Sequence, residues 1–329
     1  MSDFPIIDLG GVSGLDTISH QCLAQQLRQA LEQVGFFAVV NHGISPDLIK
    51  NIFLQARRFH ALPKEQKNAL KFSPDFTGYV PLARHVLRTS TVNDNTKGDL
   101  NEAFFMEREE PPEGADGTRA EQFCSANQWP RDLPGFRDVL MTYYRTMEGF
   151  TRRRLLPLYA QALALPIDYF EAAFSWPQAS LRLSHYPPVP RQDNQFGIAP
   201  HTDAGFLTIL PQSEVDGLHI RPPGADWIKA PKVEGGLFVN SGDMLKRWTN
   251  DRFLSTQHMA VNESTAARYA AVFFISPDLD YAMSCLPTCC DAEHPPKYEP
   301  ITYRQYRTWF MDSNYRPEAQ PRYEAQAVQ

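Results

Sequence analysis

The chain has 329 residues, is 43% hydrophobic and carries a formal net charge of -6 at pH 7, so it can bury a large core and lacks the basic surplus typical of nucleic-acid-binding proteins. No apolar run approaches the roughly 18 residues that span a bilayer, and the first residues show neither the basic nor the apolar part of an export signal. Five cysteines without a Cys-x-x-Cys pair fit reduced thiols, and we therefore expect a cytoplasmic protein with no membrane or nucleic-acid partner.

The first part of the chain alternates between strand and helix patterns. An apolar run over 4–9 predicts a short strand, apolar spacing over 19–34 predicts a helix, and 36–40 is rich in strand-forming residues. Pro46 suits the first position of a second helix that reaches about residue 60. We expect region 3–112 to supply helices and strands that support the core.

The later part of the chain predicts a different architecture. Residues 107–130 have the composition of a surface loop, and 136–165 has the spacing of a long amphipathic helix. Short strands separated by Gly, Pro and Asp then follow: 181–186, 206–210, 218–221, 236–240 and 269–275. Such a series is typical of a sandwich or jelly roll. We therefore expect a mainly β fold with flanking helices, a sandwich or jelly-roll core at 176–280, and a C-terminal helix at 300–315 packing over that core.

His201, Asp203 and His258 are the candidate metal ligands. His201 and Asp203 are two residues apart, so on an extended segment both side chains point to the same face, and His258 follows 55 residues after Asp203. Two histidines and one carboxylate leave open positions on a metal, as in non-haem iron oxygenases. About one His-x-acid tripeptide is expected by chance among 9 histidines and 38 acidic residues, so ordinary loop residues or a zinc hydrolase site are alternatives.

Arg268 begins a strand whose alternation places four side chains on one face: Arg268, Ala270, Val272 and Phe274. An arginine among apolar neighbours requires an anionic partner, because burying an unpaired charge is costly. The partner could be a dicarboxylate cosubstrate, a protein carboxylate, or solvent at the strand end. The earlier strand places Arg182, Ser184 and Tyr186 together, which suits a polar pocket or the solvated face of an edge strand.

Together these residues resemble the 2-oxoglutarate/Fe(II)-dependent dioxygenases of the isopenicillin N synthase-like family. The matching motifs run through most of the chain: Pro5-Ile6-Ile7-Asp8-Leu9, Gly35-Phe36-Phe37, Asn41-His42-Gly43-Ile44, Asp99-Leu100-Asn101-Glu102-Ala103-Phe104, Tyr186-Pro187-Pro188, His201-Thr202-Asp203-Ala204-Gly205, Asn240-Ser241-Gly242-Asp243 and Ser255-Thr256-Gln257-His258. The resemblance implies a double-stranded β-helix. It also implies Fe(II) on His201, Asp203 and His258, with 2-oxoglutarate bound through Arg268 and Tyr186, and O2 as the oxidant.

The resemblance further implies oxidation of a small-molecule substrate with release of succinate and CO2, by hydroxylation, desaturation or ring closure. Our candidates for the substrate-facing wall are Arg182, Phe206, Val272 and Phe274. Alternatives are an iron oxidase of the same fold that does not use 2-oxoglutarate, and a ligand-binding relative without catalysis. Neither the substrate nor the oligomeric state can be identified from the sequence.

Two positions depart from the family pattern. Most relatives have arginine-x-serine where this chain has Arg268-Tyr269-Ala270, and the lost hydroxyl is worth about 1 kcal/mol. An arginine-x-alanine version resembles the bacterial ethylene-forming enzymes, and that similarity implies a substrate-binding role for Arg182. Many relatives also have arginine where this chain has Met259.

Overall fold

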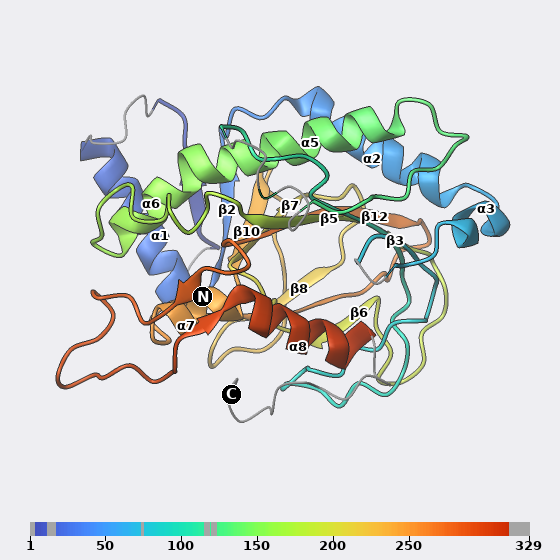
Figure 1. Cartoon of the computed structure of the whole chain (residues 1–329). Helices are drawn as coiled ribbons and strands as arrows, with labels where there is room; N and C mark the ends of the chain where they lie inside the picture. The colour runs from blue at the N-terminus through green and yellow to red at the C-terminus, as the bar shows by residue number, and fades with distance from the viewer. Residues whose placement is uncertain (1–3, 12–17, 74–75, 115–118, 120–123, 316–329) are drawn as a thin grey trace.

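The computed structural model describes residues 4–11, 18–73, 76–114, 119 and 124–315. Figure 1 shows a central larger sheet, with α2 and α5 above it and β6 and β8 below. The helical segments of the described chain are α1 (Ile18–Gln33), α2 (Pro46–His60), α3 (Lys64–Ala69), α5 (Phe136–Phe150), the π-helical turn η1 (Thr151–Leu155), α6 (Leu156–Ala162), α7 (Asp243–Trp248) and α8 (Tyr303–Tyr315).

The larger sheet has eight strands within the described residues, in the order β1-β2-β10-β7-β12-β5-β4-β3. Their bounds are β1 (Ile6–Asp8), β2 (Phe36–Val40), β3 (Gly78–Val80), β4 (Glu102–Glu107), β5 (Gln178–Tyr186), β7 (Leu207–Pro211), β10 (Leu237–Ser241) and β12 (Arg268–Ser276). The segments 3–112 and 176–280 therefore contribute strands to one sheet. All pairs are antiparallel except β1 with β2.

The smaller sheet supplies the opposite wall of the jelly roll. Its order is β6-β11-β8-β9, and the remaining two described strands, β13 and β14, pair with each other. The bounds are β6 (Ile198–His201), β8 (Leu218–Arg221), β9 (Ile228–Lys229), β11 (Gln257–Ala260), β13 (Ala282–Met283) and β14 (Ile301–Thr302). The expected mainly β fold with flanking helices and a jelly-roll core is confirmed.

The main core lies on the side of the larger sheet that faces the helices. Leu181 and Leu183 of β5 are fully buried there, as are Leu27 and Leu31 on the apolar side of α1. Successive strand residues point to opposite faces, so the alternate residues of β5 and β12 point into the space between the sheets. The fold thereby separates a dry helical core from an inner face that can carry polar side chains.

The helix expected over 136–165 is present, with an interruption. It consists of α5, the π-helical turn at 151–155 and α6, and it ends at Ala162. Pro157 stands at the first turn of α6, where its missing N–H removes a helical hydrogen bond. The last helix, α8, spans Tyr303–Tyr315.

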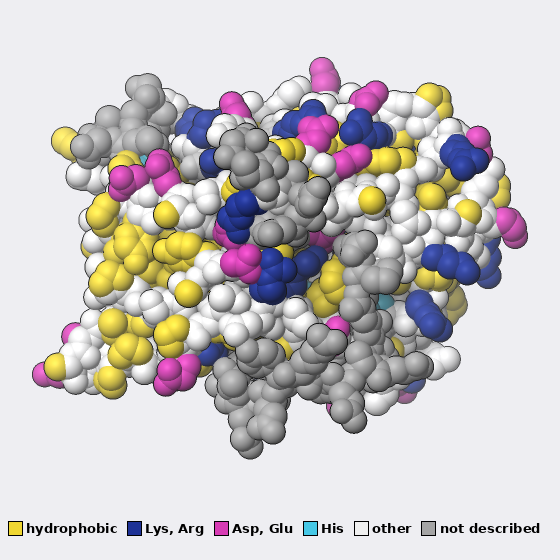
Figure 2. All heavy atoms as spheres, in the orientation of Figure 1, with side chains coloured by type: hydrophobic (Ala, Val, Ile, Leu, Met, Phe, Trp, Pro, Cys, Tyr) yellow, Lys and Arg dark blue, Asp and Glu magenta, His cyan; other side chains and the backbone are white. Residues whose placement is uncertain are grey.

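Charged side chains of both signs are interspersed on the face seen in Figure 2, and hydrophobic side chains gather at one side of it. Among the described helices, none combines the length and the apolar character needed to cross a membrane.

Candidate metal centre

His201 and His258 come together because their strands pair. His201 ends β6, His258 lies in β11, and the antiparallel register places the two residues opposite each other. Their ring centroids are 4.2 Å apart. A residue pair 57 positions apart in the sequence, 201 and 258, thus forms one side of a compact site.

Backbone carbonyls fix the orientation of both imidazoles. The Nδ1 atom of His201 lies 2.8 Å from the carbonyl oxygen of Ala199, and that of His258 lies 3.0 Å from the carbonyl oxygen of Thr256. A carbonyl can only accept, so each Nδ1 carries a proton, and each Nε2 presents a lone pair when the imidazole is neutral. Such an outer contact is the usual support for a metal-binding histidine.

Asp203 completes the group: one of its carboxylate oxygens accepts hydrogen bonds from the protein, and the other faces the two histidines. Its Oδ2 accepts hydrogen bonds from Thr208 Oγ1 at 2.6 Å and Asn240 Nδ2 at 2.7 Å. Its Oδ1 lies 3.6 Å from Nε2 of each histidine. Burial opposes ionisation of this carboxyl group, yet His258 and His201, when protonated, hold its pKa well below the usual range.

A second His-acid-His group, on the opposite face of β5, provides an internal comparison. His60, Glu102 and His185 also place their ligand atoms within 4.8 Å of one another. The carboxylate of Glu102, however, accepts hydrogen bonds from Lys67 Nζ at 2.8 Å and from His185 Nδ1 at 2.8 Å. The hydroxyl of Tyr79 donates to the same carboxylate. The ammonium group already balances this carboxylate.

Asp203 differs, because within the described residues neither a lysine nor an arginine lies at ion-pair distance from it. The ligand atoms of His201, Asp203 and His258 also lie within 4.8 Å of one another. Two neutral imidazole nitrogens and one buried anionic oxygen form a donor set that fits a divalent cation. The residues present therefore fit an iron ion at this position and favour a structural ion-pair role for the second group.

A pocket opens beside the three ligand residues, between the two sheets. Arg268, Ala270, Val272 and Phe274, which share a face of β12, all line it. Arg268 is 3% exposed, its guanidinium lies 4.6 Å from the centre of the Tyr186 ring, and its Nε and Nη1 have no hydrogen-bond acceptor among the described residues. A buried cation with no carboxylate at ion-pair distance among the described residues is suited to bind an anion.

The departure at Ala270 has a structural counterpart on the neighbouring strand. Ala270 pairs with Ser184 of β5 in the antiparallel register. The Ser184 hydroxyl is fully buried and has no hydrogen-bond partner within the described part of the chain. A hydroxyl is therefore present on this face of the sheet, one strand away from the position at which relatives carry a serine.

The remaining sequence candidates separate into two groups. Arg182, Val272 and Phe274 line the pocket with the three ligand residues. Phe206 does not; it is fully buried in the main core, where its ring packs near those of Phe174 and Trp248. Phe206 stands in a bend just before β7, so the strand alternation that brings Thr208 to the pocket does not extend to it. We therefore remove Phe206 from the candidate wall.

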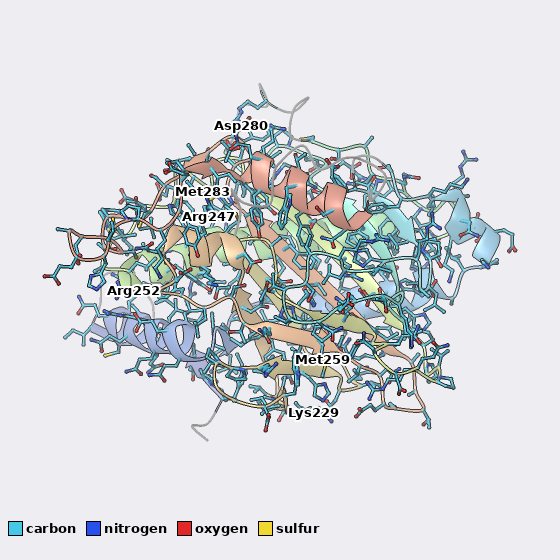
Figure 3. All side chains as sticks on the ribbon, turned by 90° about the horizontal axis from the view of Figure 1, so that it is seen from below. Lys229, Arg247, Arg252, Met259, Asp280 and Met283 are labelled. Atoms are coloured by element: carbon cyan, nitrogen blue, oxygen red, sulfur yellow. The ribbon has the colours of Figure 1, made fainter. Side chains whose placement is uncertain are left out.

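Several pocket residues were not expected to have a site role. Phe36, Leu210, Leu218 and Asn240 line the pocket from four different strands. Asn240 belongs to a motif that marks the family in the sequence, which was the available signal for it. Met259, next to His258, also lines the pocket, and Figure 3 places it near Lys229 on the smaller sheet.

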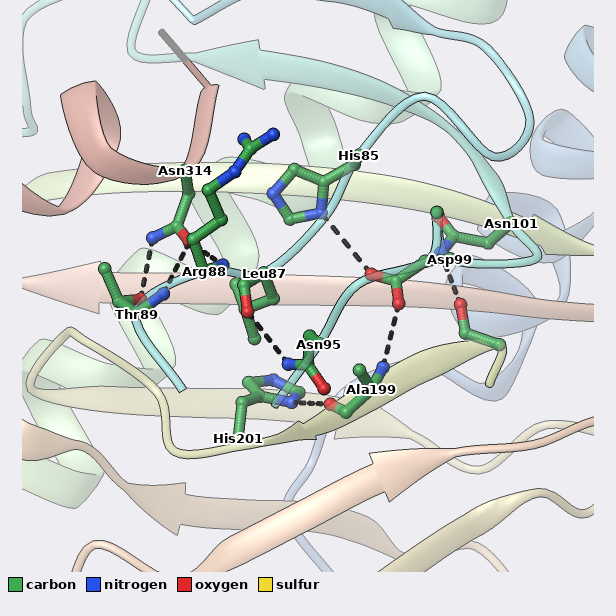
Figure 4. A network of polar contacts seen from close by, with 12 residues as sticks. His85, Leu87, Arg88, Thr89, Asn95, Asp99, Asn101, Ala199, His201 and Asn314 are labelled. Carbon is green, nitrogen blue, oxygen red and sulfur yellow. Dashed lines mark hydrogen bonds and ion pairs between the residues drawn. The ribbon is translucent and has the colours of Figure 1, made fainter. Parts of the chain in front are cut away.

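A loop network supports the ligand strand from outside (Figure 4). The carboxylate of Asp99 accepts a hydrogen bond from the backbone N–H of Ala199 at 3.0 Å, and His85 lies beside its other oxygen. Asn314 of α8 accepts from the backbone N–H groups of Arg88 and Thr89. The C-terminal helix is thus connected through the 85–101 loop to the strand that carries His201.

This fold and this site define a non-haem iron oxygenase, and comparison with known proteins identifies the family. Residues 4–132 match the family model described as non-haem dioxygenase in morphine synthesis N-terminal, and residues 177–277 match the 2OG-Fe(II) oxygenase superfamily. The chain is also 34% identical to the 2-oxoglutarate-Fe(II) type oxidoreductase hxnY of Emericella nidulans, over 91% of this chain and 86% of that protein. It therefore belongs to the 2-oxoglutarate/Fe(II)-dependent oxygenases.

Solved structures agree with this assignment. A 2OG-Fe(II) oxygenase family protein from Caulobacter crescentus superposes with a TM-score of 0.78 at 28% identity, covering 93% of this chain and 97% of that one. The structure of JOX2 with 2OG, Fe and JA gives 0.77 at 28% identity, covering 92% and 83%. The chain is an oxidoreductase that uses Fe(II), 2-oxoglutarate and O2, as the sequence predicted.

Proposed function

We propose that His201, Asp203 and His258 hold the Fe(II) of this enzyme. The observation that carries the proposal is the convergence of two Nε2 atoms and one Oδ1 atom, each oriented by a hydrogen bond on its far side. These side chains come from β6, β11 and the segment before β7, and the pocket beside them, which Arg268 also lines, would leave a free side for other ligands of the ion. That free side is where a cosubstrate and O2 need to bind.

We further propose that Arg268 binds the far carboxylate of 2-oxoglutarate. Its planar guanidinium can form two parallel hydrogen bonds to a carboxylate, and Tyr186 holds it in place from below. Iron and 2-oxoglutarate would supply the oxidising chemistry, in which 2-oxoglutarate is converted to succinate and CO2 as O2 is consumed. The protein's part is to fix both molecules and exclude water from the pocket.

The substrate side of the pocket is proposed to be Arg182, Val272 and Phe274. Apolar side chains here would hold a C–H bond near the iron, and hydroxylation is the proposed outcome. Desaturation or ring closure begins with the same hydrogen abstraction, so product analysis distinguishes them. Screening small molecules for stimulated succinate release would identify the substrate.

The metal assignment is tested by mixing the protein anaerobically with Fe(II) and 2-oxoglutarate. Members of the family then give a weak visible charge-transfer band, and we expect the same band here. His258→Ala should abolish it, whereas His294→Ala, at an exposed loop position, should leave it unchanged. A missing band in the native protein, or one that survives in His258→Ala, would contradict the assignment.

Succinate measurement separates this proposal from the two alternatives. An iron oxidase that does not use 2-oxoglutarate would oxidise its substrate without forming succinate. A non-catalytic ligand-binding relative would bind 2-oxoglutarate but turn over neither molecule. Stoichiometric succinate and product support the proposed reaction.

We also propose a cytoplasmic location, which the five free cysteines support. The division into an N-terminal region 3–112, a catalytic core 176–280 and a covering helix 300–315 belongs to the same proposal. Limited proteolysis with mass spectrometry of the fragments would test these boundaries.

A further inference from the structure

Arg182 is a second buried arginine in the pocket, and its charge is not balanced by a carboxylate. It is 8% exposed, and its Nη2 donates to the amide oxygen of Asn101 at 2.7 Å. Its guanidinium lies 5.2 Å from the centre of the Phe105 ring, and its Nε has no acceptor among the described residues. Within that part of the chain, Arg182 forms no ion pair, so all its contacts are with neutral groups or with a ring.

The surrounding polar groups hold Arg182 in place without neutralising it. The side chain of Asn101 is labelled in Figure 4, and its amide N–H donates to the carbonyl oxygen of Gly197. This contact leaves the amide oxygen of Asn101 to accept from Arg182. The nearby acid in this loop, Asp99, is engaged by the backbone N–H of Ala199 and by His85. Burial lowers the pKa of His85, and the positive charge of Arg182 contributes in the same direction. No carboxylate of the described residues lies at ion-pair distance from Arg182, so the local network orients this cation without pairing it.

Arg182 and Arg268 stand at well-separated backbone positions on neighbouring strands. In the β12–β5 register, Arg268 pairs with Tyr186, whereas Arg182 pairs with Val272, four residues further along the strand. Four residues of strand correspond to roughly 13 Å. The two guanidinium groups also rest on different rings, Tyr186 and Phe105. The pocket thus offers two anion positions, and the proposed function occupies only the one at Arg268.

We infer that Arg182, positioned by Asn101, is the binding site for a carboxylate of the primary substrate, which is therefore an organic acid with an apolar body. This inference rests on the proposed function, because it assigns 2-oxoglutarate to Arg268. A single guanidinium matches a monoanionic carboxylate in charge and geometry. Val272 and Phe105 flank the arginine, so the body of the acid meets apolar surface.

Matched ligand pairs test the inference without knowledge of the natural substrate. The probes are phenylacetate, 3-phenylpropanoate and octanoate, each with its primary amide, which has the same shape and no charge. Binding is measured by isothermal titration calorimetry to the anaerobic Fe(II)–2-oxoglutarate protein. The native protein should bind at least one acid about 10- to 100-fold more tightly than its amide, as expected for a charge-assisted pair.

Arg182→Met should remove this preference while leaving the affinity for 2-oxoglutarate unchanged, and Arg84→Met should alter neither. Arg84 is exposed, so it controls for loss of one positive charge elsewhere. Val272→Asp provides an independent variant, because it places a carboxylate opposite Arg182 in the register. That internal acid should occupy Arg182 and also abolish the preference, even if Arg182→Met fails to fold.

Three results would overturn the inference. These are the absence of any acid preference in the native protein, a preference that survives in the folded variants, and a loss of 2-oxoglutarate affinity in Arg182→Met comparable to that in Arg268→Met. The last result would assign Arg182 to the cosubstrate. Failure of the proposed function is distinguishable, since the native protein would then give no Fe(II)–2-oxoglutarate band whatever its acid preference.

Discussion

Replacing Arg268 with methionine should change stability and cosubstrate binding in opposite directions. Arg268 is 3% exposed, the Tyr186 ring lies 4.6 Å from its guanidinium, and Asp216 interacts with its charge without forming an ion pair. Such a ring contact contributes about 0.5–2 kcal/mol, whereas burying an unpaired ion costs several kcal/mol. When 2-oxoglutarate is absent, we therefore expect the free energy of unfolding of Arg268→Met to exceed that of the native protein by about 1–3 kcal/mol.

With 2-oxoglutarate present, the native protein should gain more. Losing hydrogen bonds to a charged group costs about 1.5–3 kcal/mol, which raises the dissociation constant of 2-oxoglutarate roughly 10- to 100-fold. At a concentration of about 100 times the native dissociation constant, the native protein is stabilised by about 2.7 kcal/mol and the variant by only about 0.4–1.4 kcal/mol.

Urea unfolding under anaerobic conditions with Fe(II), with and without 2-oxoglutarate, measures both quantities in one experiment. The reasoning would be refuted by a ligand-free variant several kcal/mol less stable than the native protein, because Arg268 would then have a structural partner. Equal stabilisation of the two proteins by 2-oxoglutarate would equally remove Arg268 from the cosubstrate site.

Three further changes test neighbouring features. Ala270→Ser restores the hydroxyl of the family pattern and should tighten 2-oxoglutarate binding about fivefold, for a gain of about 1 kcal/mol. Weaker binding in an anaerobic titration would show that Ser184, which pairs with position 270, leaves no room for the added hydroxyl. Asn240→Leu removes one of the two donors to Asp203 and should weaken Fe(II) binding about 10- to 100-fold in a chelator competition, and an unchanged affinity would contradict the proposed support. Burial raises the pKa of Glu107 to about 7, so the folded state binds more protons than the unfolded chain and stability falls as the pH rises from about 4.3 to 7. Glu107→Gln should lose less stability than the native protein between pH 5 and pH 7 in urea unfolding, and an equal loss would exclude this carboxyl as the source.

The strands that alternate cleanly are the ones that the sequence predicts well. Residues 36–40 and 218–221 form β2 and β8 with the expected bounds, and the helix begun by Pro46 ends at His60 as expected. Alternation also places the four inward residues of β12 correctly, because one face of that strand meets the core and the other meets the pocket. For these elements, the local pattern of apolar and polar residues is enough to predict which side chains are buried.

Other elements have no such local signal. All six residues of β4, Glu102–Glu107, are buried. This strand therefore lacks the alternation of buried and exposed residues by which a strand is recognised in a sequence. The strands β6 and β11 are four residues long, and the register that brings His201 opposite His258 depends on tertiary pairing. The expectation that Phe206 faces the pocket depended on strand alternation. Phe206 lies in the bend before β7, so the alternation that directs Thr208 to the pocket does not apply to it.

The two His-acid-His groups differ in the feature that we propose decides between a metal site and an ion pair. Both combine two histidines with one buried carboxylate, and in both the ligand atoms lie within 4.8 Å of one another. The difference is Lys67, which reaches Glu102 from α3, whereas Asp203 is held by the neutral donors Thr208 and Asn240. Neutral donors orient a carboxylate without balancing its negative charge, so a cation can still bind. An ammonium group balances that charge. The same charge accounting, applied to Arg182 and Arg268, underlies our proposals that each of these arginines binds a carboxylate, one from the substrate and the other from 2-oxoglutarate.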